Sequence, residues 1–423
     1  MIVPSNKKLI IVISFEDYNG SLGGTGKVIL SQQSVLNDNC FSTLFICPFH
    51  LQSNSKHNWL LRLDGKEIMV CNADTITRYI SLLQQSDFVV CGVQIHHLRG
   101  INIIDLETIL NSLSCPILYY VHDFYSICPN CINLMKDDGS LCNVRNISLD
   151  KCKKCDYYSK MTIIIMQFFE NNKHRIKFIC PSDSCKHIWL TRFPEYRNQT
   201  FAVYHQKLLG RYDNNGMVPV NEKIKIAYVG APSRIKGWND FLDLLKSINK
   251  NKFEVYSFGN GKCDDKTVQT VKVDYHQSND AMVKMLRQYN IQIVLLLSKW
   301  PETYSYTFYE SLAADSYIIT YSSSGNIADQ VIDRKCGLIF KNLHELEMYF
   351  QDNQTVRDDL INFRVSPHEA PLFLEENNEF IGFFENPICD EQKAVVSKNA
   401  HIKRGLVLLS LYKAKNKIKS LLR

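Results

Sequence analysis

The chain has 423 residues, of which 45% are hydrophobic and 22% are charged, and these proportions exclude a largely disordered chain. The formal net charge of +6 comes from the C-terminal end, because residues 401–423 contain seven Lys or Arg and no acidic residue. The other 400 residues hold 42 of the 49 basic residues and all 43 acidic ones, which argues against a nucleic-acid-binding surface on the folded part.

The length of the chain and its longest apolar runs indicate the class of protein. A chain of this length suits two domains of about 200 residues each. The longest apolar runs, at 9–13, 163–166 and 293–297, are too short to cross a bilayer. The first run lacks the length and the cleavage site of a signal peptide, so we expect a cytoplasmic protein. The chain has 15 cysteines, an odd number, and no recognisable export signal. This argues against a disulfide framework, so most cysteines should be reduced core residues.

In chain order, short apolar segments alternate with polar stretches of helical character. The first half predicts strands at 9–14, 43–47, 88–93, 117–122 and 177–181. The second half restarts in the same way, with predicted strands at 225–229, 253–258, 291–297, 317–321 and 337–340. Strands separated by roughly 25–40 residues are typical of βαβ units and parallel sheets.

Between the two halves, residues 211–222 combine turn formers with a proline and show no periodicity, which predicts a linker. We therefore expect an α/β protein with two Rossmann-like domains, at 1–210 and 223–395, followed by a C-terminal segment at 396–423. Ligands of open parallel sheets bind beyond the carboxyl ends of the strands, so the loops after the predicted strands should form the site.

Two loops of the first half carry candidate residues. A glycine cluster that includes Gly24 follows the first strand, where backbone can approach a ligand closely. His122 and Asp123 end the strand at 117–122. Each signal is weak alone, because glycine turns are common and a histidine at a strand end can have a purely structural role.

A cysteine cluster follows His122. Two C-x-x-C pairs separated by 20 residues match the spacing of structural zinc sites. We predict a structural zinc within an insertion at about 124–160, with a reduced cysteine-rich loop as the alternative. A catalytic zinc is not expected, because four thiolates leave the metal no open position. The candidate ligands are Cys128, Cys131, Cys142, Cys152 and Cys155.

In the second half, the loop after the strand at 225–229 contains Arg234, Lys236 and Gly237. A cation in such a loop suits a diphosphate, because it stabilises the charge that builds on a departing phosphate. A surface lysine before a turn glycine is the alternative interpretation.

The strand at 291–297 leads to Glu302 in a loop and to Glu310 in a helix predicted at about 305–314. Backbone N–H groups at the helix start would form an anion site, strengthened by the helix dipole. A diphosphate fits there, with Glu310 accepting both hydroxyls of a ribose and Glu302 facing a sugar. The alternative is an amphipathic helix with two solvated glutamates. The residues of the anion site are Tyr304, Ser305, Tyr306 and Thr307.

These motifs resemble those of family 4 glycosyltransferases, which have the GT-B fold. Glu302 and Glu310 match the E-x7-E element, and similar positions in that family carry the glycine loop, the His-Asp pair and the Lys-Gly turn. The chain departs from the family pattern at Gly230, Tyr304, Ser305, Asp315 and Tyr317. A subset of the family has cysteines equivalent to Cys128, Cys142, Cys152 and Cys155, whereas spacing favours Cys131, so the fourth zinc ligand stays open.

The resemblance implies a retaining transferase that moves a sugar from a nucleotide-sugar donor to a glycan or lipid-linked acceptor without a catalytic metal. Lys236 would contact the diphosphate, with Arg234 as a further candidate, and Glu310 the ribose. Glu302 and His122 would orient the sugar. Bacterial polysaccharide or lipopolysaccharide assembly is the implied setting. Another GT-B enzyme, such as a sugar-nucleotide epimerase, and a non-catalytic scaffold that binds nucleotide sugars are the alternatives.

The C-terminal segment has apolar residues at helical spacing, with lysines between them, over 405–423. Such a basic amphipathic helix would lie on an anionic membrane surface, at the inner face of the cytoplasmic membrane, or pack against the N-terminal domain. The sequence leaves both possibilities open.

Overall fold

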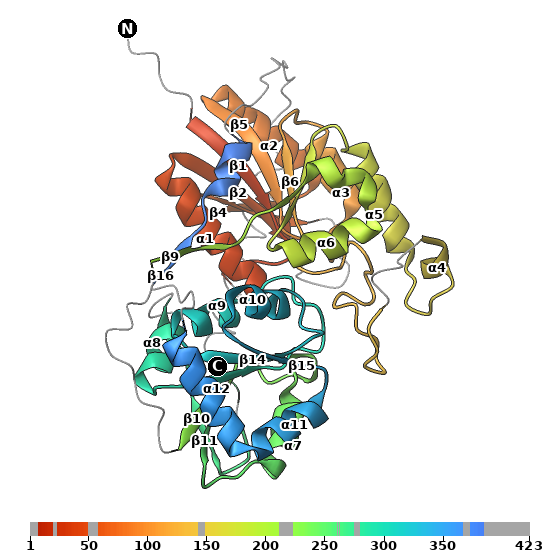
Figure 1. The fold of residues 1–423 in the computed structure, drawn as a ribbon. Coiled ribbons are helices and arrows are strands. Elements are labelled where there is room, and N and C mark those ends of the chain that lie inside the picture. Colours follow the sequence, from red (N-terminus) through yellow and green to blue (C-terminus); the bar gives the residue numbers. More distant parts are fainter. Residues whose placement is uncertain are drawn as a thin grey trace.

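The computed structural model describes residues 7–19, 23–49, 58–142, 149–210, 223–259, 261, 263–274, 280–366 and 373–384. The predicted linker at 211–222 and the C-terminal segment at 396–423 lie outside the described residues. The described chain forms two lobes that meet end to end, each built on one sheet (Figure 1). Within these residues, no helix combines the length and apolarity needed to cross a membrane.

The first lobe contains an eight-stranded sheet in the order β4-β3-β2-β1-β5-β6-β7-β8. The strands are parallel, except that β3 pairs antiparallel with β2 and with β4. The strands are β1 (Lys7–Ile13), β2 (Phe41–Pro48), β3 (Trp59–Leu63), β4 (Lys66–Cys71), β5 (Phe88–Ile95), β6 (Ile117–Tyr120), β7 (Ile176–Cys180) and β8 (Thr200–Ala202). The helices are α1 (Gly24–Asp38), α2 (Ala73–Gln85), α3 (Ile103–Leu110), α4 (Leu149–Lys153), α5 (Lys160–Asn171), α6 (Asp183–Arg192) and η2 (Pro194–Gln199).

The second lobe contains a six-stranded parallel sheet in the order β12-β11-β10-β13-β14-β15. Its strands are β10 (Ile224–Val229), β11 (Phe253–Phe258), β12 (Val268–Val271), β13 (Ile293–Leu296), β14 (Tyr317–Tyr321) and β15 (Gly337–Phe340). Its helices are η3 (Arg234–Lys236), α7 (Trp238–Ser247), α8 (Ala281–Gln288), α9 (Tyr306–Ala313), α10 (Asn326–Arg334), α11 (Leu343–Gln351) and α12 (Asn353–Val365).

Burial on both faces explains why the central strands are continuous apolar runs. In β1, the residues of 9–13 are at most 5% exposed and alternate between two core clusters, one on each face of the sheet. All ten predicted strands are present, with small shifts at their ends, and the prediction of two α/β halves with mainly parallel sheets is confirmed.

Within the described residues, the chain passes from one lobe to the other twice. After the first lobe, β9 (Gln206–Leu209) pairs antiparallel with β16 (Phe373–Glu376), which follows α12. The chain then runs back onto the first lobe as η4 (Glu379–Phe383), visible as a blue segment beside β1 (Figure 1). The last described residues of the predicted range 223–395 thus pack against the first lobe.

Phe384 holds the segment that contains η4 against the first lobe. Its side chain is 1% exposed and packs in the core cluster with Val12 and Phe380, over Gly92 of β5. We expect Phe384→Ala to lower the free energy of unfolding by about 3 kcal/mol, at the low end for a buried Phe because a short turn can partly collapse. Urea unfolding measures this loss. Phe373→Ala is the matched control, since Phe373 is 64% exposed, and an equal loss in both variants would contradict the expectation.

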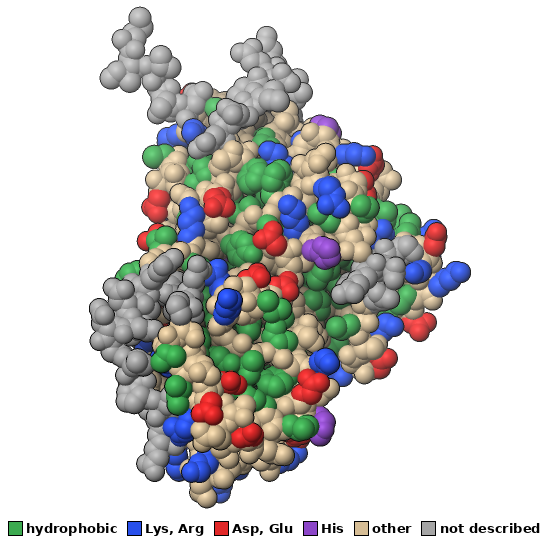
Figure 2. Space-filling view, viewed as in Figure 1, with side chains coloured by type: hydrophobic (Ala, Val, Ile, Leu, Met, Phe, Trp, Pro, Cys, Tyr) green, Lys and Arg blue, Asp and Glu red, His purple; other side chains and the backbone are tan. Residues whose placement is uncertain are grey.

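The surface in Figure 2 agrees with the charge balance of the sequence. Lys and Arg side chains on this face are interspersed with Asp and Glu, and hydrophobic side chains lie between them. On the face shown, the described residues therefore present a mixed surface rather than a basic one.

Candidate functional site

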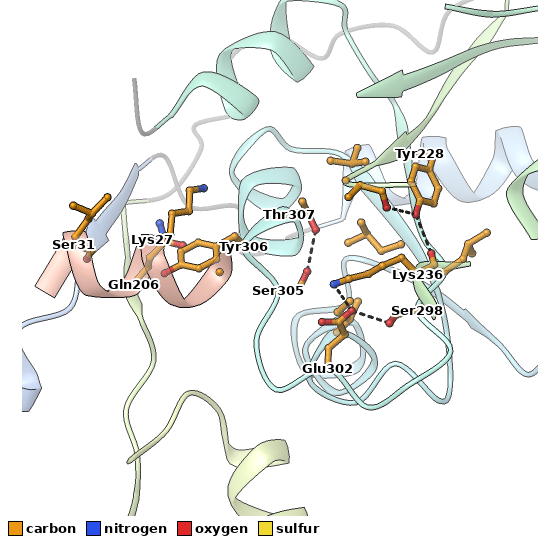
Figure 3. Close-up of a pocket in the computed structure, with 18 of the residues that line it drawn as sticks. Lys27, Ser31, Gln206, Tyr228, Lys236, Ser298, Glu302, Ser305, Tyr306 and Thr307 are labelled. Atoms are coloured by element: carbon orange, nitrogen blue, oxygen red, sulfur yellow. Dashed lines mark hydrogen bonds and ion pairs between the residues drawn. The ribbon is translucent and has the colours of Figure 1, made fainter. Parts of the chain in front are cut away.

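A cavity of about 620 Å³ lies where the two lobes meet. Its wall combines residues of α1 from the first lobe, loops at the carboxyl ends of β10 and β13 from the second, and one residue each of β9 and β16 (Figure 3). Its polar lining includes Lys27, Ser31, Gln206, Lys236, Ser298, Glu302, Ser305, Thr307 and Glu376. This is the junction where ligands of parallel sheets are expected.

Glu302 and Lys236 face one another in the cavity. The Nζ atom of Lys236 lies 2.5 Å from Oε1 of Glu302, and the hydroxyl of Ser298 donates to the same oxygen at 2.8 Å. Glu302 is 3% exposed, whereas the Lys236 side chain is 41% exposed. An ammonium group has three N–H donors, so Lys236 can bind a further anion from the cavity without leaving Glu302.

Glycine backbone holds these two side chains in place. Gly237 has φ +75°, and a Cβ atom there would lie 2.1 Å from the carbonyl oxygen of Leu297. Only glycine therefore lets the loop of Lys236 approach the end of β13 this closely. Gly325, with φ +58°, allows the same approach to Pro301, and the backbone of Glu302 then bonds to Ser324 and Asn326.

Helix α9 begins at the cavity between the two predicted glutamates. Ser305 is its N-cap, with extended backbone, and its hydroxyl accepts the N–H of Phe308 at 3.2 Å. Serine is a favoured N-cap residue, so this departure from the family glycine suits the helix start. Of the four residues predicted for the anion site, Ser305, Tyr306 and Thr307 line the cavity, whereas Tyr304 stacks on Tyr309 at 4.6 Å and does not line it.

Glu310 lies inside α9 and is 2% exposed. Its Oε1 atom is 3.1 Å from Nζ of Lys27, which comes from α1 in the other lobe and lines the cavity. Its Oε2 atom has no hydrogen-bond partner among the described residues. Burial raises the pKa of Glu310, and the charge of Lys27 opposes that rise. Glu310 itself is not a lining residue, so it meets the cavity through Lys27.

The other predicted residues of the site have different places. Gly24 lines the cavity. Arg234 and His122 do not line the cavity. Arg234 donates to the carbonyl of Asp137 at 3.1 Å, in the predicted insertion.

The ring of His122 lies between the rings of His96 and His205. Nε2 of His122 is 3.0 Å from Nδ1 of His96. Burial and the charge of the nearby His97 lower the pKa of His122 to about 3, so His122 is neutral at pH 7. The predicted roles of Arg234 and His122 stay predictions.

A pair of hydrogen bonds joins the loop of Glu302 to the first lobe. The hydroxyl of Thr303 donates to the carbonyl of His122 at 2.6 Å, and the carbonyl of Thr303 accepts from the hydroxyl of Ser182 at 2.7 Å. Thr303 and Ser182 are 3% and 0% exposed, so water competes little for these bonds. The position of Glu302 therefore depends on both lobes.

The five cysteines of the predicted zinc site surround one small cavity of about 40 Å³. A hydrogen bond with Cys131 lowers the pKa of the Cys128 thiol to about 7, while that bond and burial raise the pKa of Cys131. No group of three or more His, Cys, Asp or Glu side chains in the described part of the chain has the arrangement of a metal site. The structure therefore brings these thiols together but does not support the predicted structural zinc.

Sequence reasoning missed several residues of the cavity. Lys27 directly follows the glycine cluster, and its place in the first turns of a helix after that loop was an available signal. Ser31 donates a short hydrogen bond to Glu376 of β16, and Gln206 of β9 accepts from the hydroxyl of Tyr304 at 3.2 Å. Nothing in the local sequence around Ser31, Gln206 or Glu376 indicates a binding site.

Neither a protein-family model nor a curated protein matches the sequence. The chain is similar in structure to sucrose-phosphate synthase from Thermosynechococcus elongatus, with a TM-score of 0.54 and 11% identity over 84% of this chain and 93% of that one. Anabaena HepE in complex with UDP gives a TM-score of 0.52 and 9% identity over 84% and 93% of the two chains. A glycosyltransferase from Rickettsia africae gives a TM-score of 0.52 and 12% identity over 87% and 95%.

At these identities the similarity concerns the fold. The chain has the GT-B fold of two Rossmann-like domains, and the predicted fold class is confirmed.

Proposed function

We propose that the chain is a glycosyltransferase that binds a nucleotide-sugar donor in the cavity between its lobes. One observation carries the proposal: Lys236, Glu302 and the start of α9 surround a single cavity that also contains residues of α1. A cation, a carboxylate and a helix N-terminus, placed together between two Rossmann-like lobes, suit a diphosphate that carries a sugar.

In this proposal each part of the donor has a partner. Lys236 and the N–H groups at the start of α9 would hold the diphosphate, with Glu310 toward the ribose and Glu302 toward the sugar. In the reaction, the bond between the sugar and the β-phosphate oxygen breaks, and a bond from an acceptor oxygen to the same sugar carbon forms. Lys236 would stabilise the negative charge left on the diphosphate, which is the largest electrostatic change in the step.

The finer parts of the proposal rest on the motif resemblance described above. They are retention of the anomeric configuration, with a phosphate oxygen taking the acceptor proton, a glycan or lipid-linked acceptor, and a cytoplasmic enzyme of bacterial surface polysaccharide assembly. Anabaena HepE is known in complex with UDP and in complex with UDP-glucose, so uridine nucleotides are the first donors to test.

The test measures binding and turnover in the full-length chain. We expect one of UDP, GDP, ADP, CDP or TDP at about 1 mM to raise the melting temperature, since a ligand that binds only the folded state stabilises it. The matching nucleoside, which lacks the diphosphate, should raise it much less. The corresponding nucleotide sugars should be hydrolysed slowly without an acceptor. If no diphosphate stabilises the chain, donor binding is contradicted; if one binds but no nucleotide sugar is turned over, the enzyme assignment is contradicted.

A further inference from the structure

Lys27 belongs to the first lobe but reaches a side chain of the second. It lies in the second turn of α1, and its Nζ atom is 3.1 Å from Oε1 of Glu310 and 4.7 Å from the ring centre of Tyr306. The Lys27 side chain is 26% exposed and lines the cavity, whereas the Glu310 side chain is 2% exposed and does not. A ligand that enters the cavity therefore meets Lys27 before Glu310.

The ion pair is incomplete on the side of Glu310. Oε2 of this buried carboxylate has no hydrogen-bond partner among the described residues. A buried carboxylate with an unpaired oxygen is costly, because that oxygen has lost its water without gaining a donor. An ion pair with a purely structural role would be expected to satisfy both oxygens. Oε2 is therefore the atom of this ion pair that still lacks a donor, and Lys27, which holds the other oxygen, lines the cavity.

The charges around Lys27 indicate which part of a ligand this end of the cavity takes. Glu376 lies close enough for the charge of Lys27 to lower its pKa, although burial raises that pKa overall. Two carboxylates and one ammonium disfavour a phosphate and favour neutral hydroxyl groups, which donate to carboxylates. Lys236 lies at the other end of the cavity, with the start of α9 between the two lysines (Figure 3).

We propose that Lys27 is a positioning residue for donor binding, which acts through Glu310. A hydroxyl of the nucleotide ribose donates to Oε2 of Glu310, while Lys27 stays on Oε1 and keeps the carboxylate ionised. Because the two residues come from different lobes, the bound nucleotide stabilises the contact between the first lobe and the second. This inference rests on the proposed function, and it adds a residue and a lobe that the motif resemblance does not include.

The test is a double-mutant cycle on the full-length chain, with Lys27→Met, Glu310→Gln and the double variant. Calorimetry measures the dissociation constant of UDP, or of the diphosphate that most stabilises the wild type. We expect Lys27→Met to weaken binding about 10-fold, since it removes a charge that supports a buried hydrogen bond. The double variant should bind as Glu310→Gln does, because both changes act on the same hydroxyl contact.

Three further variants serve as controls for the double-mutant cycle. Lys27→Arg should restore most of the affinity, which keeps the proposal testable even if Lys27→Met melts at a lower temperature. Lys246→Met removes a lysine from an exposed ion pair of the second lobe and should leave the affinity unchanged. Lys236→Met should weaken binding of the same diphosphate independently of Lys27.

Separate results would overturn the inference. If Lys27→Met binds the diphosphate as tightly as the wild type, Lys27 takes no part in binding. If the variant binds it more tightly, Lys27 opposes binding. If the losses in the double variant multiply, Lys27 and Glu310 act independently. In either case a loss with Lys236→Met would keep the proposed function intact, whereas a wild type that binds no nucleoside diphosphate overturns both.

Discussion

Replacing Lys236 with Met should lower kcat for nucleotide-sugar turnover by about 10²–10³-fold, the usual cost of removing one preorganised charge that stabilises a departing group. Lys236 is the cation of the second lobe that both lines the cavity and contacts Glu302, at 2.5 Å. Hydrolysis or transfer at saturating nucleotide sugar measures the loss. Glu302 keeps its bond from Ser298 at 2.8 Å in the variant, so we expect the fold to remain.

Lys299→Met is the matched control for this prediction. Lys299 lies in the loop that also carries Glu302, but it pairs with Asp240 at 2.6 Å and does not line the cavity. Its removal should change kcat by less than about threefold, because this ion pair lies outside the cavity. Equal activities of Lys236→Met and Lys299→Met would show that Lys236 takes no part in the chemistry.

The repeat of strands along the chain was sufficient to predict two α/β lobes, because buried parallel strands leave apolar runs that are visible in the sequence. The antiparallel pair β3 and β4 was missed. Its turn contains Asp64 and Gly65 with φ +47° and +77°, and Asp-Gly is a common hairpin signal. The strands on either side carry charged residues such as Arg62 and Glu67, which weaken the apolar pattern.

The motif residues of the second lobe were predictable because one loop and one helix carry them. Glu302 and the start of α9 are adjacent in sequence, and Lys236 follows the neighbouring strand. The contribution of the first lobe was not predictable in this way. Lys27 and Glu310 are 283 positions apart, and their contact depends on how the lobes meet. Arg234 shows the same limit, because its partner at Asp137 belongs to the other lobe.

Glu310→Ala should weaken binding of the donor nucleotide about 100-fold or more. A hydrogen bond to a charged acceptor contributes about 1.5–3 kcal/mol, and the carboxylate would accept from one or both ribose hydroxyls. Calorimetric titration with UDP, or with the diphosphate that stabilises the wild type, measures the loss. Glu195→Ala, at an exposed position of the first lobe, is the control and should bind as the wild type does.

The 2′-deoxy form of the same nucleotide makes this prediction specific to the ribose. The wild type should bind the deoxy form more weakly than the ribose form, whereas Glu310→Ala should bind both about equally, because the group that distinguishes them is gone. Burial raises the pKa of Glu310, so this preference should be present above that pKa and fade as the pH falls through it. If Glu310→Ala keeps the wild-type preference for the 2′-hydroxyl, another residue holds the ribose, and the orientation of the donor along α9 is reversed or displaced.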